Sequence, residues 1–371
     1  MTNNNDNNSN NVNDNNSGDV LSSSLKSPVE LGYYMPAEWE KHDAIWLSWP
    51  HDPLTFPDCV EKVEETYVQI IKEIHESEDV NLFVKDQNMK DKVIHMLQVV
   101  GGVDFTKIHF FIFDYADVWF RDYGPTFIIN NNQQKLAMVN WIFNAWGDKY
   151  DELIKDKYIP QVINKTLQLP CFNPSIVMEG GSFDVNGKGT LLTTEQCLLN
   201  TNRNPSLTRA DIENYLKNHL GITHFIWLKN GICGDDTDGH IDDLARFVNP
   251  TTIVCAYEDN PDNQNYAALK GNYDILKTAT DQNGNPLNII KLPMPDNIID
   301  DECLLPASYT NFYIGNTKIL MPTFNHKNDA AAMTILQELF PNKKIIGIDC
   351  TYLVNGYGTI HCISQQQPTP K

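Results

Sequence analysis

Long apolar runs are missing from this chain, because no stretch of 18 consecutive apolar residues occurs among its 371 residues. A membrane-spanning helix needs about 20 such residues, so the sequence predicts none. Basic residues are also few, with 28 Lys and Arg against 48 Asp and Glu and a formal net charge of −20. Nucleic acid is therefore an unsuitable partner, because binding to phosphates requires a basic surface.

Cysteine is sparse and irregularly placed. The eight cysteines show neither the CxxC spacing of zinc and redox motifs nor the dense framework of a disulfide-rich domain. Free thiols of this kind suit a reducing, cytoplasmic compartment. The GxSxG and HExxH motifs of serine hydrolases and zinc proteases are also missing, which excludes the commonest forms of both classes.

Apolar residues are almost absent from the N-terminal segment, which consists mainly of Asn, Asp and Ser. It lacks the charged and then apolar pattern of a secretory signal. Residues 1–29 cannot bury enough surface to offset the entropy of ordering, so we predict a disordered tail. With 41% apolar residues, the chain can form a large core, and we predict a single domain over residues 30–371.

A repeated order of elements, namely two strands, a helix and a third strand, runs through the chain. The clearest unit has predicted strands over residues 182–185 and 189–193, a helix over 208–220 and a strand over 224–228. Asn186-Gly187 separates the first two strands, and an Asn-Gly pair in this position is a strong hairpin signal.

The same order recurs in other parts of the chain, and the two ends of the chain together supply a fifth unit. There, a predicted strand over residues 359–364 pairs with one over 44–48, followed by a helix over 60–75 and a strand over 80–84. Closing five units into a ring removes exposed sheet edges. The pattern therefore predicts an α/β propeller of five pseudo-repeated strand–strand–helix–strand units around a central axis. The three remaining units begin near residues 126, 244 and 310.

The densest polar motif of most units comes immediately before the first strand or early in it. Equivalent positions in a closed ring converge at one end of its axis, so these motifs are expected to form a single pocket. The predicted pocket contains Asp122, Glu179, His240, Asp242 and Cys362.

Each of these residues also has a structural alternative. Asp122 can pair with the neighbouring Arg121, and Glu179 can cap a helix or a turn. His240 can be a satisfied core histidine, and Cys362 can be a buried structural thiol, because free cysteine is among the most buried residue types. These alternatives explain each residue alone but not their equivalent places in the repeat, which favours a functional site.

A cysteine, a histidine and three carboxylates suit attack by a thiolate on a cationic carbon. A guanidinium group fits this description, because it pairs bidentately with carboxylates. Cys362 is the predicted nucleophile, and His240 protonates the departing ammonia and then activates water. We expect His240 and Asp242 to lie in a strand, where residues two apart share a face. A free thiol is only slightly ionised at pH 7, so a cationic neighbour or the substrate must assist.

Several longer motifs follow one another along the chain. They are Gly32-Tyr33-Tyr34-Met35-Pro36, Trp119-Phe120-Arg121-Asp122-Tyr123-Gly124-Pro125, Glu179-Gly180-Gly181-Ser182, Gly239-His240-Ile241-Asp242 and Ile360-His361-Cys362. From about residue 31 to residue 368 the sequence resembles the agmatine deiminases, also called agmatine iminohydrolases. This resemblance implies the pentein α/β-propeller fold and hydrolysis of agmatine to N-carbamoylputrescine and ammonia on a route to putrescine. It also implies that neither a metal nor an organic cofactor takes part.

The resemblance also assigns roles to individual residues. Cys362 matches the nucleophile of the family, and His240 matches its general acid/base. Asp122 and Asp242 match the carboxylates that hold the guanidinium, and Glu179 matches a further acidic residue near the histidine.

Three more residues are predicted to contact the substrate. Trp119 matches an aromatic residue of the substrate channel, Asp236 is expected to face the amine end, and Gly358 belongs to the turn before the nucleophile. This turn departs from the Gly-Gly-Gly pattern of the family, because Tyr357 takes its middle place. A positive φ at this position would strain a tyrosine, and its ring could narrow the pocket.

Three rival functions follow from the same residues. A peptidylarginine deiminase would use the same fold and catalytic set, whereas a free-arginine deiminase would need a cation for the substrate carboxylate. A non-catalytic guanidine-binding protein would result if Tyr357 disables the turn. For agmatine deiminase, the partner is a small cationic substrate, and the resemblance implies a homodimer or a larger homo-oligomer.

Overall fold

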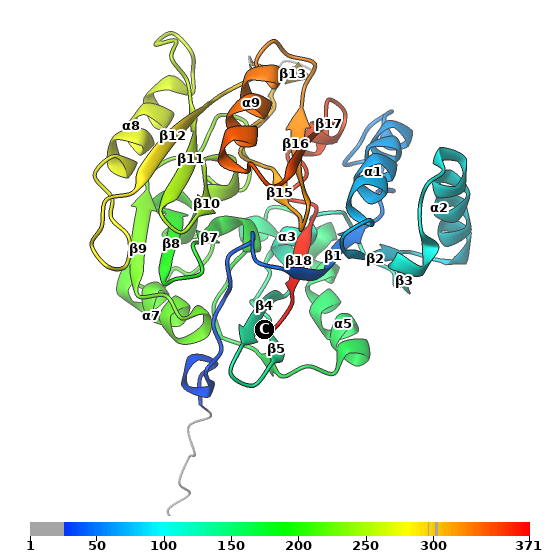
Figure 1. The fold of residues 1–371 in the computed structure, drawn as a ribbon, viewed down its shortest axis with the longest axis horizontal. Coiled ribbons are helices and arrows are strands. Elements are labelled where there is room, and N and C mark those ends of the chain that lie inside the picture. The colour runs from blue at the N-terminus through cyan, green and yellow to red at the C-terminus, as the bar shows by residue number, and fades with distance from the viewer. Residues whose placement is uncertain (1–25, 296, 301–302) are drawn as a thin grey trace, which may run out of the picture.

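The computed structural model of the protein describes residues 26–295, 297–300 and 303–371. The predicted tail over residues 1–29 therefore lies almost entirely outside the described residues. Five sheets of three or four strands surround a common centre, and the longer helices lie at the periphery (Figure 1). No helix in these ranges has both the length and the apolar character that crossing a membrane requires.

The unit with the Asn-Gly turn follows the predicted order. Its elements are β7 (Phe183–Val185), β8 (Thr190–Thr194), α7 (Arg209–Leu220) and β9 (His224–Leu228). Strands β7 and β8 are antiparallel, whereas β8 and β9 are parallel and are connected through α7. Local sequence defines the ends of the helix, because Thr208 and Asp211 form a capping box and Gly221 ends the helix with a φ of 77°.

Three further units repeat this order. The first consists of β4 (Thr126–Asn130), β5 (Lys135–Val139), α4 (Ala145–Asp148), η3 (Asp151–Tyr158), α5 (Ile159–Leu167) and β6 (Cys171–Phe172). The second consists of β10 (Ala245–Asn249), β11 (Thr252–Tyr257), α8 (Tyr266–Leu276) and β12 (Asn288–Pro293). The third consists of β15 (Tyr313–Ile314), β16 (Lys318–Thr323), α9 (Asp329–Leu339) and β17 (Lys344–Asp349). In each unit the first two strands are antiparallel and the second and third are parallel.

The fifth unit joins the two ends of the chain, as predicted. Its elements are β18 (Gln365–Pro368), β1 (His42–Ser48), α1 (Val60–Ile74) and β2 (Asp79–Val84). Strand β1 pairs antiparallel with β18 and parallel with β2. Helix α2 (Gln87–Val100) and strand β3 (Ile108–Ile112) extend this sheet to four strands, which the repeat pattern did not predict.

The strand predicted over residues 359–364 is wrong. Residues 359–363 form turns or irregular backbone, and strand β18 begins at Gln365. The backbone N–H of His361 donates to the carbonyl oxygen of Asn311 at 3.1 Å and to its side-chain oxygen at 2.9 Å. This N–H group therefore cannot join a strand ladder, and the chain stays irregular up to Ser364.

Further short elements lie between the five units or within them. They are η1 (Val29–Leu31), η2 (Phe105–Lys107), α3 (Phe120–Tyr123), η4 (Gly180–Ser182), α6 (Glu195–Leu198), η5 (Ile241–Asp243), β13 (Ile299–Asp300), β14 (Cys303–Leu304) and η6 (Leu353–Gly356). Three of them, namely α3, η4 and η5, immediately precede the first strands β4, β7 and β10.

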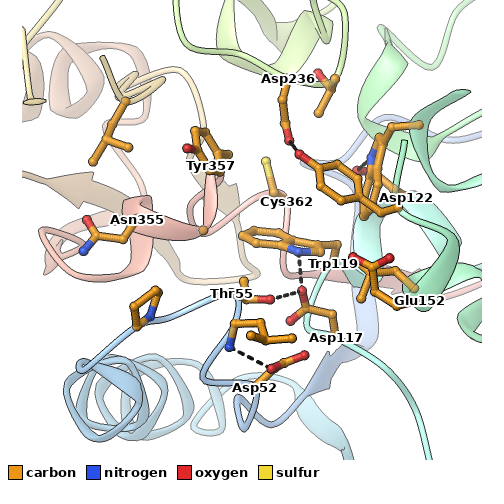
Figure 2. A pocket seen from close by; sticks show the side chains of 18 residues that line it. Asp52, Thr55, Asp117, Trp119, Asp122, Glu152, Asp236, Asn355, Tyr357 and Cys362 are labelled. Atoms are coloured by element: carbon orange, nitrogen blue, oxygen red, sulfur yellow. Dashed lines mark hydrogen bonds between the residues drawn. The ribbon is translucent and has the colours of Figure 1, made fainter. Parts of the chain in front are cut away.

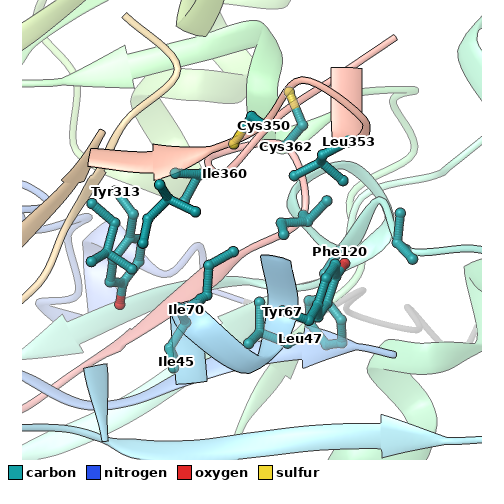
Figure 3. Packing of buried hydrophobic residues seen from close by; sticks show 14 of the residues in the cluster. Ile45, Leu47, Tyr67, Ile70, Phe120, Tyr313, Cys350, Leu353, Ile360 and Cys362 are labelled. Carbon is teal, nitrogen blue, oxygen red and sulfur yellow. The ribbon is translucent and has the colours of Figure 1, made fainter. Parts of the chain in front are cut away.

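A large apolar core supports the turn that carries Cys362. Ile45 of β1 and Tyr67 and Ile70 of α1 are fully buried in it, as are Leu353 and Ile360 on the C-terminal segment (Figure 3). Burial of one such aliphatic side chain contributes about 1.5–3 kcal/mol to stability. Apolar packing thus fixes the irregular segment before β18, although this segment forms no strand.

Candidate active site

The five residues of the predicted pocket meet near the centre of the fold. The short elements α3, η4 and η5 carry or adjoin Asp122, Glu179, His240 and Asp242, and the turn before β18 carries Cys362. All five side chains are buried. The Nδ1 atom of His240 lies 3.7 Å from Oδ1 of Asp122, and the thiol of Cys362 lies 3.8 Å from Oδ2 of Asp242. The four motifs from separate units therefore form one site.

Gly181 explains how these groups come so close together. A Cβ atom added here would lie 2.6 Å from Nδ1 of His240, 2.9 Å from Oδ1 of Asp122 and 3.0 Å from Oδ2 of Asp242. Its own N–H donates to Oδ1 of Asp122 at 3.0 Å. The position therefore requires glycine for the approach of three functional side chains and not only for the backbone turn.

A cavity of about 320 Å³ opens onto this cluster. Asp122, Cys362, Trp119, Asp236 and Tyr357 line it (Figure 2). The wall thus unites the predicted nucleophile and Asp122 with two of the three predicted substrate contacts, Trp119 and Asp236, whereas Gly358 is not part of it. No Lys, Arg or His belongs to its described wall. The wall carries five carboxylates, from Asp52, Asp117, Asp122, Glu152 and Asp236. Such a wall suits a ligand with positive charge and repels one with negative charge.

His240, Asp242 and Glu179 lie next to the wall residues and not on the wall itself. Each carries at least one buried nitrogen or oxygen atom without a hydrogen-bond partner among the described residues. Buried polar atoms are normally paired, so unpaired ones at one place indicate room for a polar ligand.

The thiol of Cys362 lies in a negatively charged environment. Burial and the carboxylates of Asp242, Asp243 and Asp122 raise its pKa well above the usual range. The thiol is therefore protonated at neutral pH. A cationic ligand beside these carboxylates would offset their effect and favour the thiolate.

His240 has the opposite tendency. Burial alone would lower the pKa of its imidazole, but Asp122 beside it raises that pKa well above the usual value. The ring is therefore protonated at neutral pH and can serve as a proton donor. The prediction that His240 and Asp242 lie in a strand is wrong, because Ile241–Asp243 forms the 3-10 turn η5. Both side chains nevertheless approach the position of a Gly181 Cβ atom, so they share one site.

Asp122 is held by two donors. The indole Nε1 of Trp146 donates to its Oδ2 at 2.9 Å, and the N–H of Gly181 donates to its Oδ1 at 3.0 Å. Burial raises the pKa of Asp122 to about 6, with a further contribution from Asp242 and Glu179 and an opposing one from His240. Its carboxylate is therefore ionised at neutral pH and protonated in mild acid.

Glu179 is fixed from behind by a buried arginine. The Nε atom of Arg203 donates to Oε1 of Glu179 at 2.6 Å, and its Nη1 donates to Oδ2 of Asp238 at 2.6 Å. Charge-assisted bonds of this kind define the orientation of a carboxylate. The sequence interpretation assigned Arg203 no role, although Arg203 lies in the same stretch as the other family motifs.

Within the described part of the chain, two groups of side chains have the ligand spacing of a metal site. Ligand atoms of Glu179, Cys197 and His240 lie within 4.8 Å of one another, as do those of Asp242, Asp243 and Cys362. In the first group, however, Arg203 already places a cation against Glu179. The expectation that no metal or cofactor takes part stays a prediction.

The aromatic wall of the cavity depends on the glycines of the turn. A Cβ atom added at Gly358 would lie 2.5 Å from Cζ3 of Trp119 and 3.2 Å from the thiol of Cys362. The indole Nε1 of Trp119 donates to Oδ2 of Asp117 at 2.9 Å, which fixes the ring (Figure 2). Tyr357 has a φ of 69°, so the middle position of the turn is left-handed and strains its tyrosine.

Asp236 lies on the cavity wall, in the loop before η5. The hydroxyl group of Tyr150 donates to its Oδ2 at 2.5 Å, and Lys149 donates to its backbone oxygen. Burial raises the pKa of this carboxyl group, while the hydrogen bond from Tyr150 partly offsets the effect. The geometry is compatible with the predicted contact to a substrate amine.

Sequence reasoning missed Asn311, Glu38 and the role of His361. Asn311 comes two residues before β15, which is the equivalent position in the remaining unit. The repeat could therefore have identified it. His361 stands in the Ile360-His361-Cys362 motif and Glu38 comes two residues after the Gly32–Pro36 motif, but nothing in the local sequence indicates their mutual contact at 2.9 Å.

The fold and the site together define the class of the protein. An α/β propeller of five such units, with a buried cysteine, a histidine and carboxylates at its centre, is a pentein. The chain belongs to the Porphyromonas-type peptidyl-arginine deiminase family, whose family model matches residues 34–368.

The chain is also similar to individual proteins that are named agmatine deiminases. The chain is 37% identical over 348 residues to a putative agmatine deiminase of Legionella pneumophila subsp. pneumophila, which covers 92% of this chain and 97% of the relative. It is similar to the structure of the Enterococcus faecalis agmatine deiminase, with a TM-score of 0.88, 32% identity and coverage of 94% and 99% of the two chains. A cysteine-to-serine variant of the C. jejuni agmatine deiminase with substrate bound has a TM-score of 0.81 and 31% identity, with coverage of 91% and 97%.

Proposed function

We propose that this protein is an agmatine deiminase, a hydrolase that converts agmatine to N-carbamoylputrescine and ammonia. The observation that carries this proposal is the cavity at Cys362, whose described wall holds five carboxylates and no basic side chain. Agmatine fits such a wall, because it carries a guanidinium and an ammonium group but no carboxylate. The relatives named above support the same substrate, which would place the enzyme in putrescine formation.

In the first half of the reaction, Asp122 and Asp242 accept hydrogen bonds from the guanidinium and orient its carbon toward Cys362. The sulfur attacks this carbon, and its proton passes through the Asp242 carboxylate, 3.8 Å away, to the departing nitrogen, which is finally released as ammonium. His240, which is protonated at neutral pH, gives one proton to the departing nitrogen, so that ammonia leaves. The product of this half is a cationic amidino-thioether on Cys362.

In the second half, water attacks the same carbon and gives a proton to His240. The carbon–sulfur bond then breaks, which releases the ureido product and restores the thiol. Glu179, held by Arg203, lies beside His240 and favours its protonated form during both halves. Cys362 thus supplies the nucleophile and His240 the acid/base. Asp122 and Asp242 supply the carboxylates that a guanidinium needs.

A peptidylarginine deiminase is the second candidate, because the matching family model carries that description. A free-arginine deiminase receives less support. The substrate carboxylate would lie against Asp52, Glu152 and Asp236 without a cation on the described wall to neutralise it.

The deciding experiment compares release of ammonia from agmatine, arginine and a blocked arginyl peptide by the purified protein. Release from agmatine with N-carbamoylputrescine as co-product is the expected result. Release from the peptide instead would reassign the substrate and keep the mechanism. Binding of agmatine without release would identify a guanidine-binding protein and implicate Tyr357.

We further propose that residues 30–371 act as a single catalytic domain, because the motifs of one site come from four units of the ring. The cytoplasmic location and the homodimeric or larger assembly stay predictions. Light scattering on the eluting peak of a gel-filtration column would determine the assembly.

A further inference from the structure

The thiol of Cys362 has an amide donor, Asn311, which plays no part in the two half-reactions described above. The Nδ2 atom of Asn311 lies 3.0 Å from the sulfur and also 3.0 Å from Oδ1 of Asp243. The side chain of Asn311 is fully buried. It comes from the unit of β15, which supplies none of the five residues in the predicted pocket.

The hydrogen-bond network around Asn311 determines which end of its amide faces the thiol. Its Oδ1 accepts from the hydroxyl group of Thr359 at 2.8 Å, from the N–H of His361 at 2.9 Å and from the N–H of Cys362 at 3.3 Å. All three partners are donors, so the oxygen must point toward them. The NH₂ group consequently points toward the sulfur and toward Asp243.

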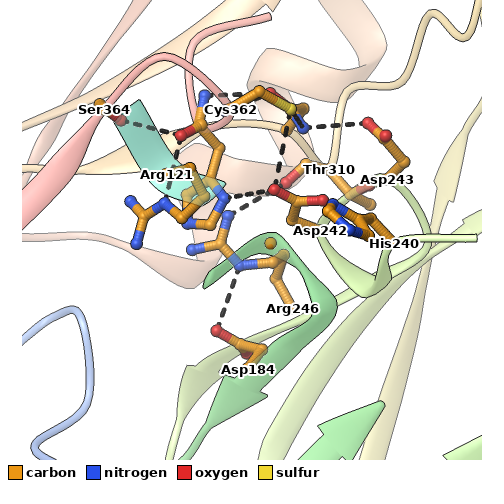
Figure 4. A network of polar contacts seen from close by, with 12 residues as sticks. Arg121, Asp184, His240, Asp242, Asp243, Arg246, Thr310, Cys362 and Ser364 are labelled. Atoms are coloured by element: carbon orange, nitrogen blue, oxygen red, sulfur yellow. Dashed lines mark hydrogen bonds and ion pairs between the residues drawn. The ribbon is translucent and has the colours of Figure 1, made fainter. Parts of the chain in front are cut away.

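This amide acts against an otherwise unfavourable environment. The carboxylates of Asp242 and Asp243 lie beside Cys362 (Figure 4). Together with Asp122 they raise the pKa of the thiol and disfavour a thiolate, and a backbone hydrogen bond from Thr359 only partly opposes them. A hydrogen bond donated to the charged form of a group favours that form. Asn311 can therefore stabilise the thiolate without adding a positive charge that would repel a cationic substrate.

We propose that Asn311 is a positioning residue for the nucleophile, with its oxygen holding the Cys362 turn and its NH₂ group donating to the sulfur as the thiolate forms. Its consequence for turnover rests on the proposed function, whereas its effect on the thiol does not. With Asn311 included, each of the five units places at least one polar side chain at the central site, as the repeat predicts.

The test measures alkylation of Cys362 by iodoacetamide as a function of pH, in the wild type and in two variants. Asn311→Asp keeps the oxygen that holds the turn but replaces the donor by a carboxylate, and Asn311→Ser removes the donor without adding charge. Mass spectrometry of the C-terminal fragment would quantify Cys362, with the fully buried Cys350 on the same fragment as an internal reference. Thermal unfolding would establish that each variant is folded.

We expect the alkylation profile of Cys362 to move upward by about one to two pH units in both variants. At any pH below the midpoint, this shift lowers the alkylation rate about 10- to 100-fold. Asn311→Asp should show the larger shift because of its charge. If this variant fails to fold, Asn311→Ser decides the question alone.

Asn272→Asp provides a matched control. Asn272 is also buried, and its amide makes the same kind of structural bonds, accepting from the N–H of Lys229 at 2.9 Å and donating to the carbonyl of Asn230 at 2.8 Å. The Asn272→Asp variant should lose stability without shifting the pH profile of Cys362 alkylation. An unchanged profile in folded Asn311 variants would overturn the proposal. A shifted profile in a protein that releases no ammonia from agmatine would refute the proposed function and leave the role of Asn311 intact.

Discussion

The Nδ1 atom of His361 lies 2.7 Å from Oδ2 of Asp242, the same oxygen that faces the Cys362 thiol. On its other side, the Nε2 atom of His361 lies 2.9 Å from Oε2 of Glu38, which also accepts from Arg246 at 2.6 Å. The pocket is thus connected by a continuous chain of hydrogen bonds, from Asp242 through His361 and Glu38, to the buried Arg246. Burial alone would raise the pKa of Asp242, but His361 lowers it, so this carboxylate stays ionised.

Replacing His361 by Leu should therefore affect both stability and catalysis. Leucine leaves the buried carboxylates of Asp242 and Glu38 each without one hydrogen-bond partner, and an unsatisfied buried group costs about 1–3 kcal/mol. The pKa of Asp242 should also rise, which weakens its hold on the guanidinium. Chemical denaturation and agmatine kinetics would measure the two effects. His361→Gln, which can still donate one hydrogen bond, should lose less stability than His361→Leu. If His361→Leu were as stable as the wild type, the contact with Asp242 would have no structural role.

Cys362→Ala should abolish turnover while agmatine still binds, because the carboxylates that hold the guanidinium remain in place. Calorimetry would measure the binding, and ammonia release would measure the turnover. Cys255→Ala serves as the control, since Cys255 is buried in β11 and does not belong to the cavity wall. Full activity of the Cys362 variant would exclude the covalent mechanism.

Tyr357→Gly and Tyr357→Ala both remove the ring, but only glycine relieves the left-handed backbone. We expect the Gly variant to be more stable than the Ala variant by about 1 kcal/mol, as measured by chemical denaturation. The ring lines the cavity, whereas the thiol contacts Asn311 and Asp242, so both variants should change KM for agmatine more than kcat. A gain in kcat of tenfold or more in both would show instead that this tyrosine hinders the chemistry.

Gly358→Ala should lower activity because an added methyl group would collide with Trp119 and approach the thiol. We expect kcat/KM for agmatine to fall by at least about tenfold, since small displacements in an active site are costly. Gly271→Ala, in helix α8, is the matched control because a Cβ atom there meets nothing within 4 Å. That change should stabilise the protein by about 0.5–1 kcal/mol and leave activity unaltered. Wild-type kinetics in Gly358→Ala would show that the turn adapts.

Activity and stability should respond to acid in opposite directions. Burial raises the pKa values of Asp117 and Asp122 to about 6 and that of Asp156 to about 7. Below pH 6, protonated Asp122 no longer accepts from the guanidinium, so kcat/KM should fall. Because of these raised values, the three carboxyl groups bind more protons in the folded state than in the unfolded state between about pH 4 and pH 7. Burial lowers the pKa values of His51 and His219, which act in the opposite direction, but the three carboxyl groups outnumber them. Unfolding should therefore become less favourable as pH decreases from 7.5 to 5.5.

A pH–rate profile and a series of melting temperatures would test both trends on the same preparation. Constant kcat/KM down to pH 5 would contradict the assignment of Asp122. A melting temperature that falls between pH 7.5 and pH 6 would contradict the raised pKa values of the three carboxyl groups.

Much of the fold was predictable because its information is local. The Asn186-Gly187 turn, the cap at Thr208 and the stop at Gly221 each act over a few residues, and the structure places the helix and strands of this unit as predicted. The pocket was predictable for a related reason, since residues at equivalent places in a ring converge. Predictions that depended on the exact backbone path were less successful, as the turn at Ile241 and the late start of β18 at Gln365 show.

The sequence by itself determined the order of the five units and the fold family. It also indicated that Cys362, His240 and the acidic residues around them would gather at the central site. Only the tertiary structure decided which groups touch the thiol and how they are charged. The contact of Asn311 with Cys362 and that of His361 with Glu38 join residues 51 and 323 positions apart, so no local pattern encodes them. The altered pKa values likewise arise from burial and from neighbours contributed by other units, which exist only once the ring has closed.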